Sequence, residues 1–231
     1  MYKCWRNGIA GVDGNGQSEL VEAITGLRKV EKGKVLLEGK DITNSKPTEI
    51  RSLGISHIPE DRNKRGLNRA LSIMDNLVAT NIDKKPFVKG MVLNENEKLD
   101  YSKQLIERFD IRPSNPKLST GALSGGNAQK VVVAREVTMG NKLLVASQPT
   151  RGVDIGAIES IRNIIQEAKE KGVGILLVSA DLEEIISLSD RILVMYEGKI
   201  NGELKAIDAN ENNLGMLMMG GKLGKEEGEA L

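Results

Sequence analysis

The chain has 231 residues, and 33 Lys and Arg balance 32 Asp and Glu to a formal net charge of +1. This balance disfavours a broad electrostatic surface for nucleic acid, and 3% aromatic residues are too few for a base-stacking platform. The single cysteine, Cys4, and the single histidine, His57, exclude an internal disulfide framework and a histidine cluster for a metal. No apolar run approaches the roughly 18 residues of a membrane-spanning helix, so any membrane contact is expected to go through a partner.

Short β-branched runs alternate with amphipathic stretches, which is typical of an α/β protein. In chain order we expect a strand at 8–12, a helix at 18–27, strands at 34–37 and 55–58, helices at 71–80, 95–110 and 125–139, a strand at 142–146, a helix at 155–171, a strand at 173–179, a helix at 182–188 and a strand at 191–196. The alternation predicts a mainly parallel sheet with flanking crossover helices. The block from about 70 to 140 interrupts it and predicts a helical subdomain.

The helix expected at 155–171 shows the clearest periodicity, and Asp154 precedes it as the predicted N-cap. Its buried face is predicted to consist of Ile155, Ile158, Ile161, Ile165 and Ala168. A C-terminal helix is expected to pack through Met216, Met218 and Met219. The glycine- and glutamate-rich segment 220–231 is expected to be a disordered tail.

A glycine-rich segment follows the first expected strand and opens the first expected helix. It reads Gly11-Val12-Asp13-Gly14-Asn15-Gly16-Gln17-Ser18 and fits the phosphate-loop pattern G-x-x-x-x-G-K-[ST] with one departure. Gln17 stands where the lysine belongs, so the loop lacks a charged contact worth roughly 1.5–3 kcal/mol. Backbone N–H groups and the helix N-terminus remain to bind phosphate. Ser18 is the candidate magnesium ligand, and Glu19 completes the candidate nucleotide site; a plain glycine-rich turn is the alternative for this segment alone.

A second motif opens the helix expected at 125–139. It reads Leu123-Ser124-Gly125-Gly126-Asn127-Ala128-Gln129, and here the chain resembles the ATP-binding cassette (ABC) transporter ATPases, whose signature is LSGGxxQ. A serine and two glycines at a helix N-terminus form an anion site. The resemblance implies that this site faces a phosphate bound on a second cassette in a head-to-tail dimer, with Leu123, Ser124, Gly125, Gly126, Asn127 and Gln129 as its residues. A serine-capped helix with flexible glycines is the structural alternative.

The other motifs of this family fall in order along the chain, with changed residues. Leu143-Leu144-Val145-Ala146-Ser147-Gln148-Pro149-Thr150 takes the Walker B position, so Ser147 replaces the acidic magnesium partner and Gln148 replaces the carboxylate that polarises the attacking water. Asp154 falls in the D-loop, Glu60 takes the place of the Q-loop glutamine, and Ala180 stands where the family has its switch histidine. Loss of a general base alone costs about 10²–10⁴ in rate. The resemblance therefore implies a degenerate nucleotide site beside an intact signature.

Several segments resemble the second cassette of fused bacterial importers for simple sugars and nucleosides. They are Pro59-Glu60-Asp61-Arg62 with Arg65-Gly66-Leu67, Gln148-Pro149-Thr150-Arg151-Gly152-Val153-Asp154, and Leu188-Ser189-Asp190-Arg191 with Tyr196-Glu197-Gly198. Ser179-Ala180-Asp181-Leu182 favours the nucleoside branch. The resemblance covers about residues 9–219, the expected cassette domain. Because only ten residues precede Gly11, the family's N-terminal strands and adenine-stacking aromatic are expected to be truncated, with 1–8 as an atypical start; Tyr2 and Trp5 lie too close to the loop to replace that aromatic.

The resemblance implies an ATP-binding component of a bacterial importer that supplies its signature to the ATP and Mg²⁺ site of a partner cassette. Implied partners are that second cassette, transmembrane permease subunits and, indirectly, a solute-binding protein, at the cytoplasmic face of the cell membrane, with no nucleic acid. ATP hydrolysis as half of a composite site is one open function, and the isolated chain is then expected to be nearly inactive. The other is a non-catalytic regulatory or structural cassette that binds nucleotide weakly and transmits closure to the membrane subunit. A soluble ABC protein of translation or DNA repair is disfavoured, because the chain has no long coiled-coil insertion and no strongly basic surface.

Overall fold

The computed structural model describes residues 6–90 and 92–223 of the chain. Cys4, Tyr2 and Trp5 lie outside the described residues. The chain divides into two compact units, Met1–Leu53 with Gly174–Leu231, and Gly54–Val173. We call the first the phosphate-loop unit and the second the signature unit, after the motif that each contains.

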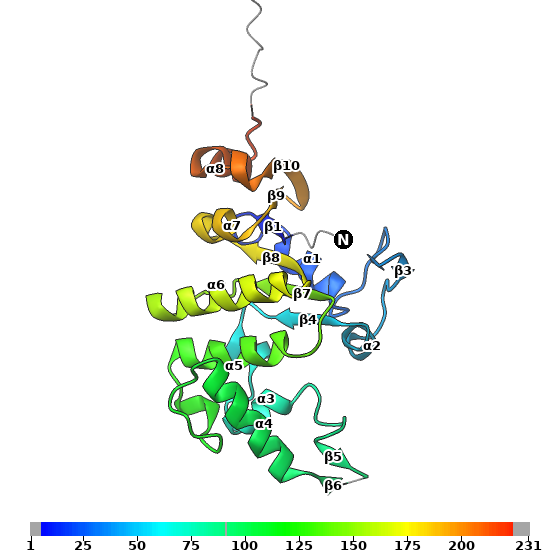
Figure 1. Cartoon of the computed structure of the whole chain (residues 1–231). Coiled ribbons are helices and arrows are strands. Elements are labelled where there is room, and N and C mark those ends of the chain that lie inside the picture. Colours follow the sequence, from blue (N-terminus) through cyan, green and yellow to red (C-terminus); the bar gives the residue numbers. More distant parts are fainter. Residues whose placement is uncertain (1–5, 91, 224–231) are drawn as a thin grey trace, which may run out of the picture. The chain divides into compact units, whose positions relative to one another are not determined.

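The phosphate-loop unit contains β1 (Arg6–Ala10), α1 (Gln17–Ile24), β2 (Leu36–Leu37), β3 (Lys40–Asp41), α2 (Pro47–Ser52), β8 (Gly174–Ser179), α7 (Leu182–Leu188), β9 (Arg191–Tyr196), β10 (Lys199–Lys205), a 3₁₀ turn (Ala206–Asp208) and α8 (Glu211–Met218). Figure 1 labels all of these except β2 and the 3₁₀ turn. Strand β1 runs parallel to β8 on one side and to β9 on the other. Ile9 is buried opposite Val178 and Leu193. The predictions of β8 and β9 are confirmed to within one residue, because both are rich in β-branched and aliphatic residues. The strand expected at 8–12 is displaced to 6–10, where Arg6 and Asn7 interrupt the apolar pattern.

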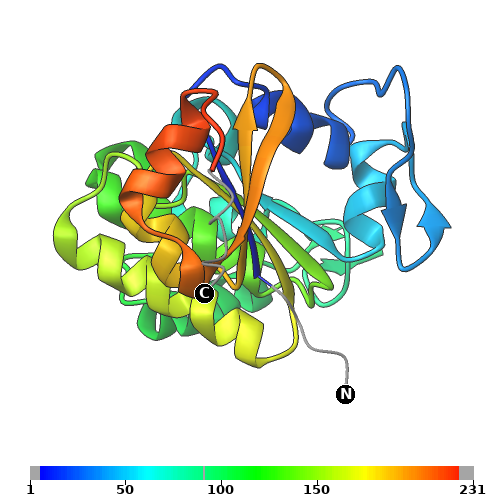
Figure 2. The same ribbon diagram turned by 90° about the horizontal axis from the view of Figure 1, so that it is seen from above.

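Strand β10 returns antiparallel to β9 and closes a hairpin. The turn residues Glu197 and Gly198 have φ of 46° and 72°, the positive values that a two-residue hairpin of the right twist requires. Helix α8 contacts both strands of this hairpin, and Figure 2 shows it in red-orange alongside the orange hairpin.

The signature unit contains β4 (Ile55–Ile58), a π-helical turn η1 (Arg62–Gly66), α3 (Ile73–Val78), β5 (Val88–Lys89), β6 (Val92–Leu93), α4 (Glu95–Arg108), a 3₁₀ turn η2 (Thr120–Ala122), α5 (Gly125–Val137), β7 (Leu143–Ser147) and α6 (Ile155–Glu170). Strands β4 and β7 pair in parallel, with Ile58 opposite Ala146. Within the block expected to be helical, β5 and β6 form a small hairpin that the sequence analysis does not predict. Every helix among the described residues is too short or too polar to cross a lipid bilayer.

Helix α5 is the most deeply packed helix of the signature unit and contacts α3, α6, β4 and η1. Four successive residues of it are fully buried, namely Val131, Val132, Val133 and Ala134. The next two residues are buried and charged. Arg135 donates from Nε to Glu136 Oε1 at 2.8 Å and from Nη2 to the carbonyl of Gly66 at 2.8 Å, while Glu136 Oε2 accepts the backbone N–H of His57 at 3.3 Å. A buried ion pair with further hydrogen bonds therefore anchors the signature helix to β4 and η1.

The predicted N-cap of α6 is confirmed, because Asp154 Oδ1 accepts the N–H of Ala157 at 3.0 Å. The predicted apolar face is wrong at Ile155, which is 85% exposed, and Ile158 is only half-buried. The buried stripe instead runs through Ala157, Ile161, Ile165 and Ala168. These residues follow one another at spacings of four, four and three, whereas Ile155 lies off that stripe by more than a quarter turn.

Helix α8 forms where the methionines predict a C-terminal helix, but its buried face differs. Met218 is buried with Leu214 and Leu217, whereas Met216 and Met219 are exposed. The expected packing face is therefore wrong at two of its three positions, because the 214–217–218 spacing is the one that turns toward the β9–β10 hairpin. The first residues of the expected tail are hydrogen-bonded, since Gly221 O accepts from Asn201 Nδ2 at 2.8 Å; residues 224–231 lie outside the described part of the chain.

Candidate functional site

The phosphate loop joins β1 to α1. The backbone of Gly14 and Gly16 is left-handed, with φ of 90° and 102°, a conformation that glycine adopts without a steric penalty. Gly16 is the N-cap of α1, and with no side chain it cannot itself accept a hydrogen bond from the first-turn N–H groups. Such a helix start is suited to an anionic ligand. Three further residues of the candidate site are exposed on this loop and the first turn, Asp13, Ser18 and Glu19.

Gln17 takes the lysine position, and its side chain turns back into the loop. The residue is 7% exposed, and its Nε2 donates to the carbonyl of Val12 at 3.0 Å. A Cβ added to Gly11 would lie 2.1 Å from that Nε2 and 2.9 Å from the carbonyl oxygen of Met195, so a side chain at this position would displace the Gln17 amide. The amide thus binds the loop's own backbone.

Asn15 closes the same loop further. Its Nδ2 donates to the carbonyl of Val12 at 3.0 Å, and its backbone N–H donates to the same oxygen at 3.3 Å. On the other side, Asn15 Oδ1 accepts the N–H of Glu197 at 2.8 Å, and Asn15 O accepts the N–H of Gly198 at 3.0 Å. Hydrogen bonds between uncharged amide groups therefore hold the phosphate loop to the turn between β9 and β10. The sequence analysis does not predict this role of Asn15.

The signature motif opens α5 as predicted. Ser124 is exposed and is the N-cap, accepting at Oγ from the N–H of Asn127 at 3.4 Å and from its Nδ2 at 3.1 Å. Asn127 Oδ1 in turn accepts the N–H of Arg112 at 2.6 Å. The buried side chain of Gln129 donates from Nε2 to the carbonyl of Pro149 at 2.8 Å. The signature therefore keeps an exposed hydroxyl at its tip while its glutamine binds the segment that follows β7.

The D-loop residue Asp154 lies against the second glycine of the signature. A Cβ added to Gly126 would lie 2.7 Å from Asp154 Oδ2 and 2.7 Å from the Cβ of Ala157. Only a glycine allows the start of α5 to approach the N-cap of α6 this closely. The structure thus brings the signature and the D-loop of the same chain together.

The Walker B position ends β7 without a carboxylate. Ser147 is 7% exposed, and its Oγ has no hydrogen-bond partner among the described residues. Gln148 has a left-handed backbone, with φ of 46°, which is uncommon for a residue with a side chain and concentrates at functional positions. The sequence gives no sign of this backbone conformation.

The structure also describes the residues at the expected Q-loop and switch positions, Glu60 and Ala180. Glu60 forms an ion pair with Arg151, so its carboxylate is engaged within the signature unit. Ala180 lies between two hydrogen-bonding residues at the end of β8: Ser179 Oγ accepts the N–H of Asp181 at 3.1 Å, and Asp181 Oδ1 caps α7. A methyl side chain at Ala180 offers no acceptor for a proton.

The residues of these sites fit a nucleotide phosphate better than they fit a divalent cation. The glycine conformations and the open start of α1 match an anion. Magnesium prefers carboxylate and phosphate oxygens, and Ser18 and Ser147 supply only hydroxyls. No cluster of three or more His, Cys, Asp and Glu suited to a metal occurs within 6–90 and 92–223.

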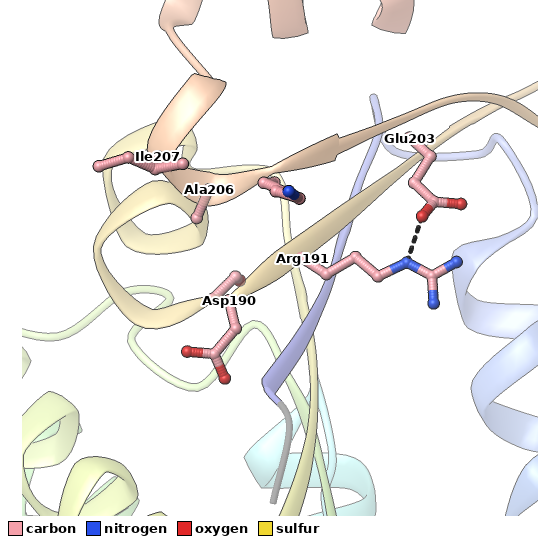
Figure 3. Close-up of a pocket in the computed structure, with 7 residues that line it drawn as sticks. Asp190, Arg191, Glu203, Ala206 and Ile207 are labelled. Carbon is pink, nitrogen blue, oxygen red and sulfur yellow. Dashed lines mark ion pairs between the residues drawn. The ribbon is translucent and has the colours of Figure 1, made fainter. Parts of the chain in front are cut away.

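A pocket of about 690 Å³ lies on the phosphate-loop unit and contains none of the predicted site residues. Figure 3 shows its lining, in which Arg191 Nε lies 2.5 Å from Glu203 Oε1. The hydrogen bond from Arg191 lowers the pKa of Glu203 from its usual value. Acidic and basic residues alternate around this pocket, so it favours neither sign of ligand charge.

Comparison with known proteins settles the family. A family model described as ABC transporter matches residues 1–151. The chain belongs to the ABC transporter family. It is 45% identical over 223 residues to the guanosine import ATP-binding protein NupO of Bacillus subtilis (strain 168), covering 96% of this chain and 44% of that protein. It is 46% identical over 216 residues to the glucose import ATP-binding protein TsgD13 of Haloferax volcanii, covering 93% of this chain and 39% of that protein.

The ABC cassette fold is shown by solved structures as well. The crystal structure of the ADP conformation of MJ1267, an ATP-binding cassette of an ABC transporter, aligns with a TM-score of 0.72 at 27% identity, covering 94% of this chain and 85% of that one. The expected α/β cassette is therefore confirmed. The chain spans less than half the length of the two import proteins that it matches.

Proposed function

We propose that this ABC chain is the second, degenerate cassette of an importer for nucleosides or simple sugars. It supplies the signature at the start of α5 to ATP and Mg²⁺ bound by a partner cassette, while its own phosphate loop turns over little ATP. Its further partners are permease subunits and, through them, a solute-binding protein, at the cytoplasmic face of the membrane. The import functions named for its two relatives support the solute class.

One contrast carries this proposal. The signature is complete and presents the exposed Ser124 at a helix N-terminus, whereas the Gln17 amide is bound to the loop's own Val12 carbonyl. Ser147, Gln148 and Ala180 supply neither a carboxylate nor an imidazole to the motif positions they occupy. The cassette domain extends over about 9–219, with its helical subdomain at about 70–140.

The test compares two single variants in the assembled importer reconstituted in membranes. Ser124→Arg places bulk and charge where the partner's γ-phosphate must lie. Removing one donor of this kind typically costs about 10²–10³ in rate, so ATPase and transport should collapse. Gln17→Ala removes one neutral donor from a site that turns over little ATP, so activity should fall by less than about tenfold, the size of one ordinary hydrogen bond.

The second candidate function is a non-catalytic regulatory or structural cassette, which the closed phosphate loop also supports. It predicts that both variants transport about as well as the unmodified chain. If Gln17→Ala is damaging and Ser124→Arg is tolerated, the proposed division of labour is wrong.

A further inference from the structure

One arginine of the signature unit holds two successive carbonyls of the loop that follows β7. Arg62, the first residue of η1, donates from Nη1 to the carbonyl of Arg151 at 2.8 Å and from Nη2 to that of Gly152 at 3.0 Å. These partners lie 89 and 90 residues further along the chain. Two parallel donors on one rigid plane are specific to the guanidinium group, because a lysine presents a single flexible point charge.

Neighbouring residues hold Arg62 and its loop in place. Asp61 accepts the N–H groups of Asn63 and Lys64 at 3.0 and 3.1 Å, which fixes the turn that begins with Arg62. The backbone bond from Lys64 is the main cause of the lowered pKa of Asp61. The ion pair between Glu60 and Arg151 joins the same two segments a second time, and residues of both line a hollow of about 360 Å³.

The guanidinium also lies against the first glycine of the signature. A Cβ added to Gly125 would lie 2.9 Å from Arg62 Nη2 and 3.0 Å from the carbonyl oxygen of Gly152. Gly125, Arg62 and Gly152 therefore meet at one point. Any displacement of the guanidinium changes what supports the start of α5.

We propose that Arg62 is a positioning residue for the signature. It holds the carbonyls of Arg151 and Gly152 against Gly125, and so keeps the N-terminus of α5 and Ser124 aligned toward the phosphate of the partner cassette. This inference rests on the proposed function. Arg62 acts through Gly125 and Gly152 rather than on the nucleotide.

The first test measures ATPase kinetics of the reconstituted importer with Arg62→Met and Arg62→Lys. The signature acts where charge develops in the transition state, so misalignment should lower kcat about tenfold or more and leave the KM for ATP almost unchanged. Lysine should not rescue kcat, since it cannot bind both carbonyls at once. The matched control is Arg108→Met on α4, whose guanidinium lies 4.9 Å from the centre of the Phe109 ring, and it should leave kcat unchanged.

The second test measures backbone hydrogen exchange in the 231-residue chain, without nucleotide or partner. Both Arg62 variants should speed exchange of the amides at 151–156 about tenfold or more, the effect of a lost charged hydrogen bond. Arg108→Met should not. This readout does not depend on ATP hydrolysis and detects the loosened loop directly, while a thermal melt of each variant reports whether the whole chain has unfolded.

The outcomes separate the two proposals. If Ser124→Arg abolishes ATPase and both Arg62 variants keep normal kcat, the positioning role is wrong and the proposed function stands. If Ser124→Arg leaves ATPase activity intact, the proposed function is wrong. Unchanged hydrogen exchange at 151–156 in Arg62→Lys and Arg62→Met would in that case still contradict the positioning role of Arg62. Full rescue by lysine, or a lower kcat without faster exchange at 151–156, also overturns it, because charge or another contact would then be responsible.

Discussion

The phosphate loop and the signature are both glycine-containing helix starts, yet they are held in different ways. Neutral amides close the phosphate loop, where Asn15 and Gln17 donate to the carbonyl of Val12. The signature is held by its packing, since Gly125 and Gly126 meet the loop after β7 and the N-cap of α6 without room for a methyl group. Because hydrogen bonds within the phosphate loop hold its backbone, the loop keeps its shape without a lysine at position 17. The signature glycines, in contrast, are part of the close packing inside the signature unit.

The largest expected effect tests the phosphate-loop side of this comparison. We expect the unmodified isolated chain to bind ATP more weakly than micromolar and to turn over ATP far more slowly than 1 s⁻¹, the lower end of the usual enzyme range. Gln17→Lys alone should recover little, because groups that act as a unit do not contribute additively. A variant that combines four changes should turn over ATP about 10² times faster, or more, than Gln17→Lys alone. The four changes are Gln17→Lys, Ser147→Asp, Gln148→Glu and Ala180→His. Phosphate release at saturating Mg-ATP measures these rates, and 1 s⁻¹ or faster from the unmodified chain or from Gln17→Lys would contradict the assignment.

The next effect tests the charged anchor of the signature helix. Arg135→Met leaves Glu136 buried without its ion-pair partner, which typically costs about 3–5 kcal/mol. The double variant Arg135→Met/Glu136→Leu leaves no buried charge. It should therefore lower the free energy of unfolding by less than the sum of the two single changes. The control is Lys171→Met, which removes an exposed pair with Glu167 worth at most about 1 kcal/mol. Urea unfolding measures all of them, and equal costs for Arg135→Met and Lys171→Met would show that the anchor is not needed.

A pair of glycine variants sharpens the packing part of the comparison. Gly126→Ala adds a methyl group 2.7 Å from the Cβ of Ala157 and from Asp154 Oδ2, so it should destabilise the chain by about 1–3 kcal/mol. Gly156→Ala, also in a helix, meets only Asp154 Oδ1 at 3.6 Å. It should be neutral or stabilising by roughly 0.4–1 kcal/mol. Thermal unfolding of the two variants decides the matter, and a harmless Gly126→Ala would mean that α5 and α6 can separate at no cost.

The smallest effect is a difference in acid sensitivity. Burial raises the pKa of Asp75, but hydrogen bonds from Ser72 and Lys98 outweigh burial and hold it below the ordinary 3.8; Lys98 Nζ lies 2.9 Å from Asp75 Oδ1. A lowered carboxyl pKa contributes stability above the unfolded pKa, and this stability is lost as pH falls from 3.8 through the folded value. The side-chain amides of Asn15 and Gln17 do not titrate, so their hydrogen bonds in the phosphate loop carry no such pH dependence. Asp75→Asn should therefore make the free energy of unfolding less dependent on pH below pH 4. The same pH dependence as in the unmodified chain would contradict a role for the Asp75–Lys98 ion pair.

The sequence predicts the family, most of the helices and strands, and the two glycine-containing segments that begin α1 and α5. Those features depend on local patterns, in which residues at helical or strand spacing bury one face and short motifs place glycines at turns. Even there, Ile155 and Met219 show the limit, because an apolar residue is buried only where another element lies opposite.

How the motifs are held in place depends on contacts between residues far apart in the chain. Whether Gln17 points outward or back to Val12 depends on the free space beside Gly11, and no spacing in the sequence encodes it. The two hydrogen bonds from Arg62 to the carbonyls of Arg151 and Gly152 join residues 89 and 90 positions apart. The hydrogen bond from Arg135 to Gly66 joins residues 69 positions apart. Contacts over such distances leave no periodic trace in the sequence, because each needs only one residue of the correct reach at the point where the folded chain returns.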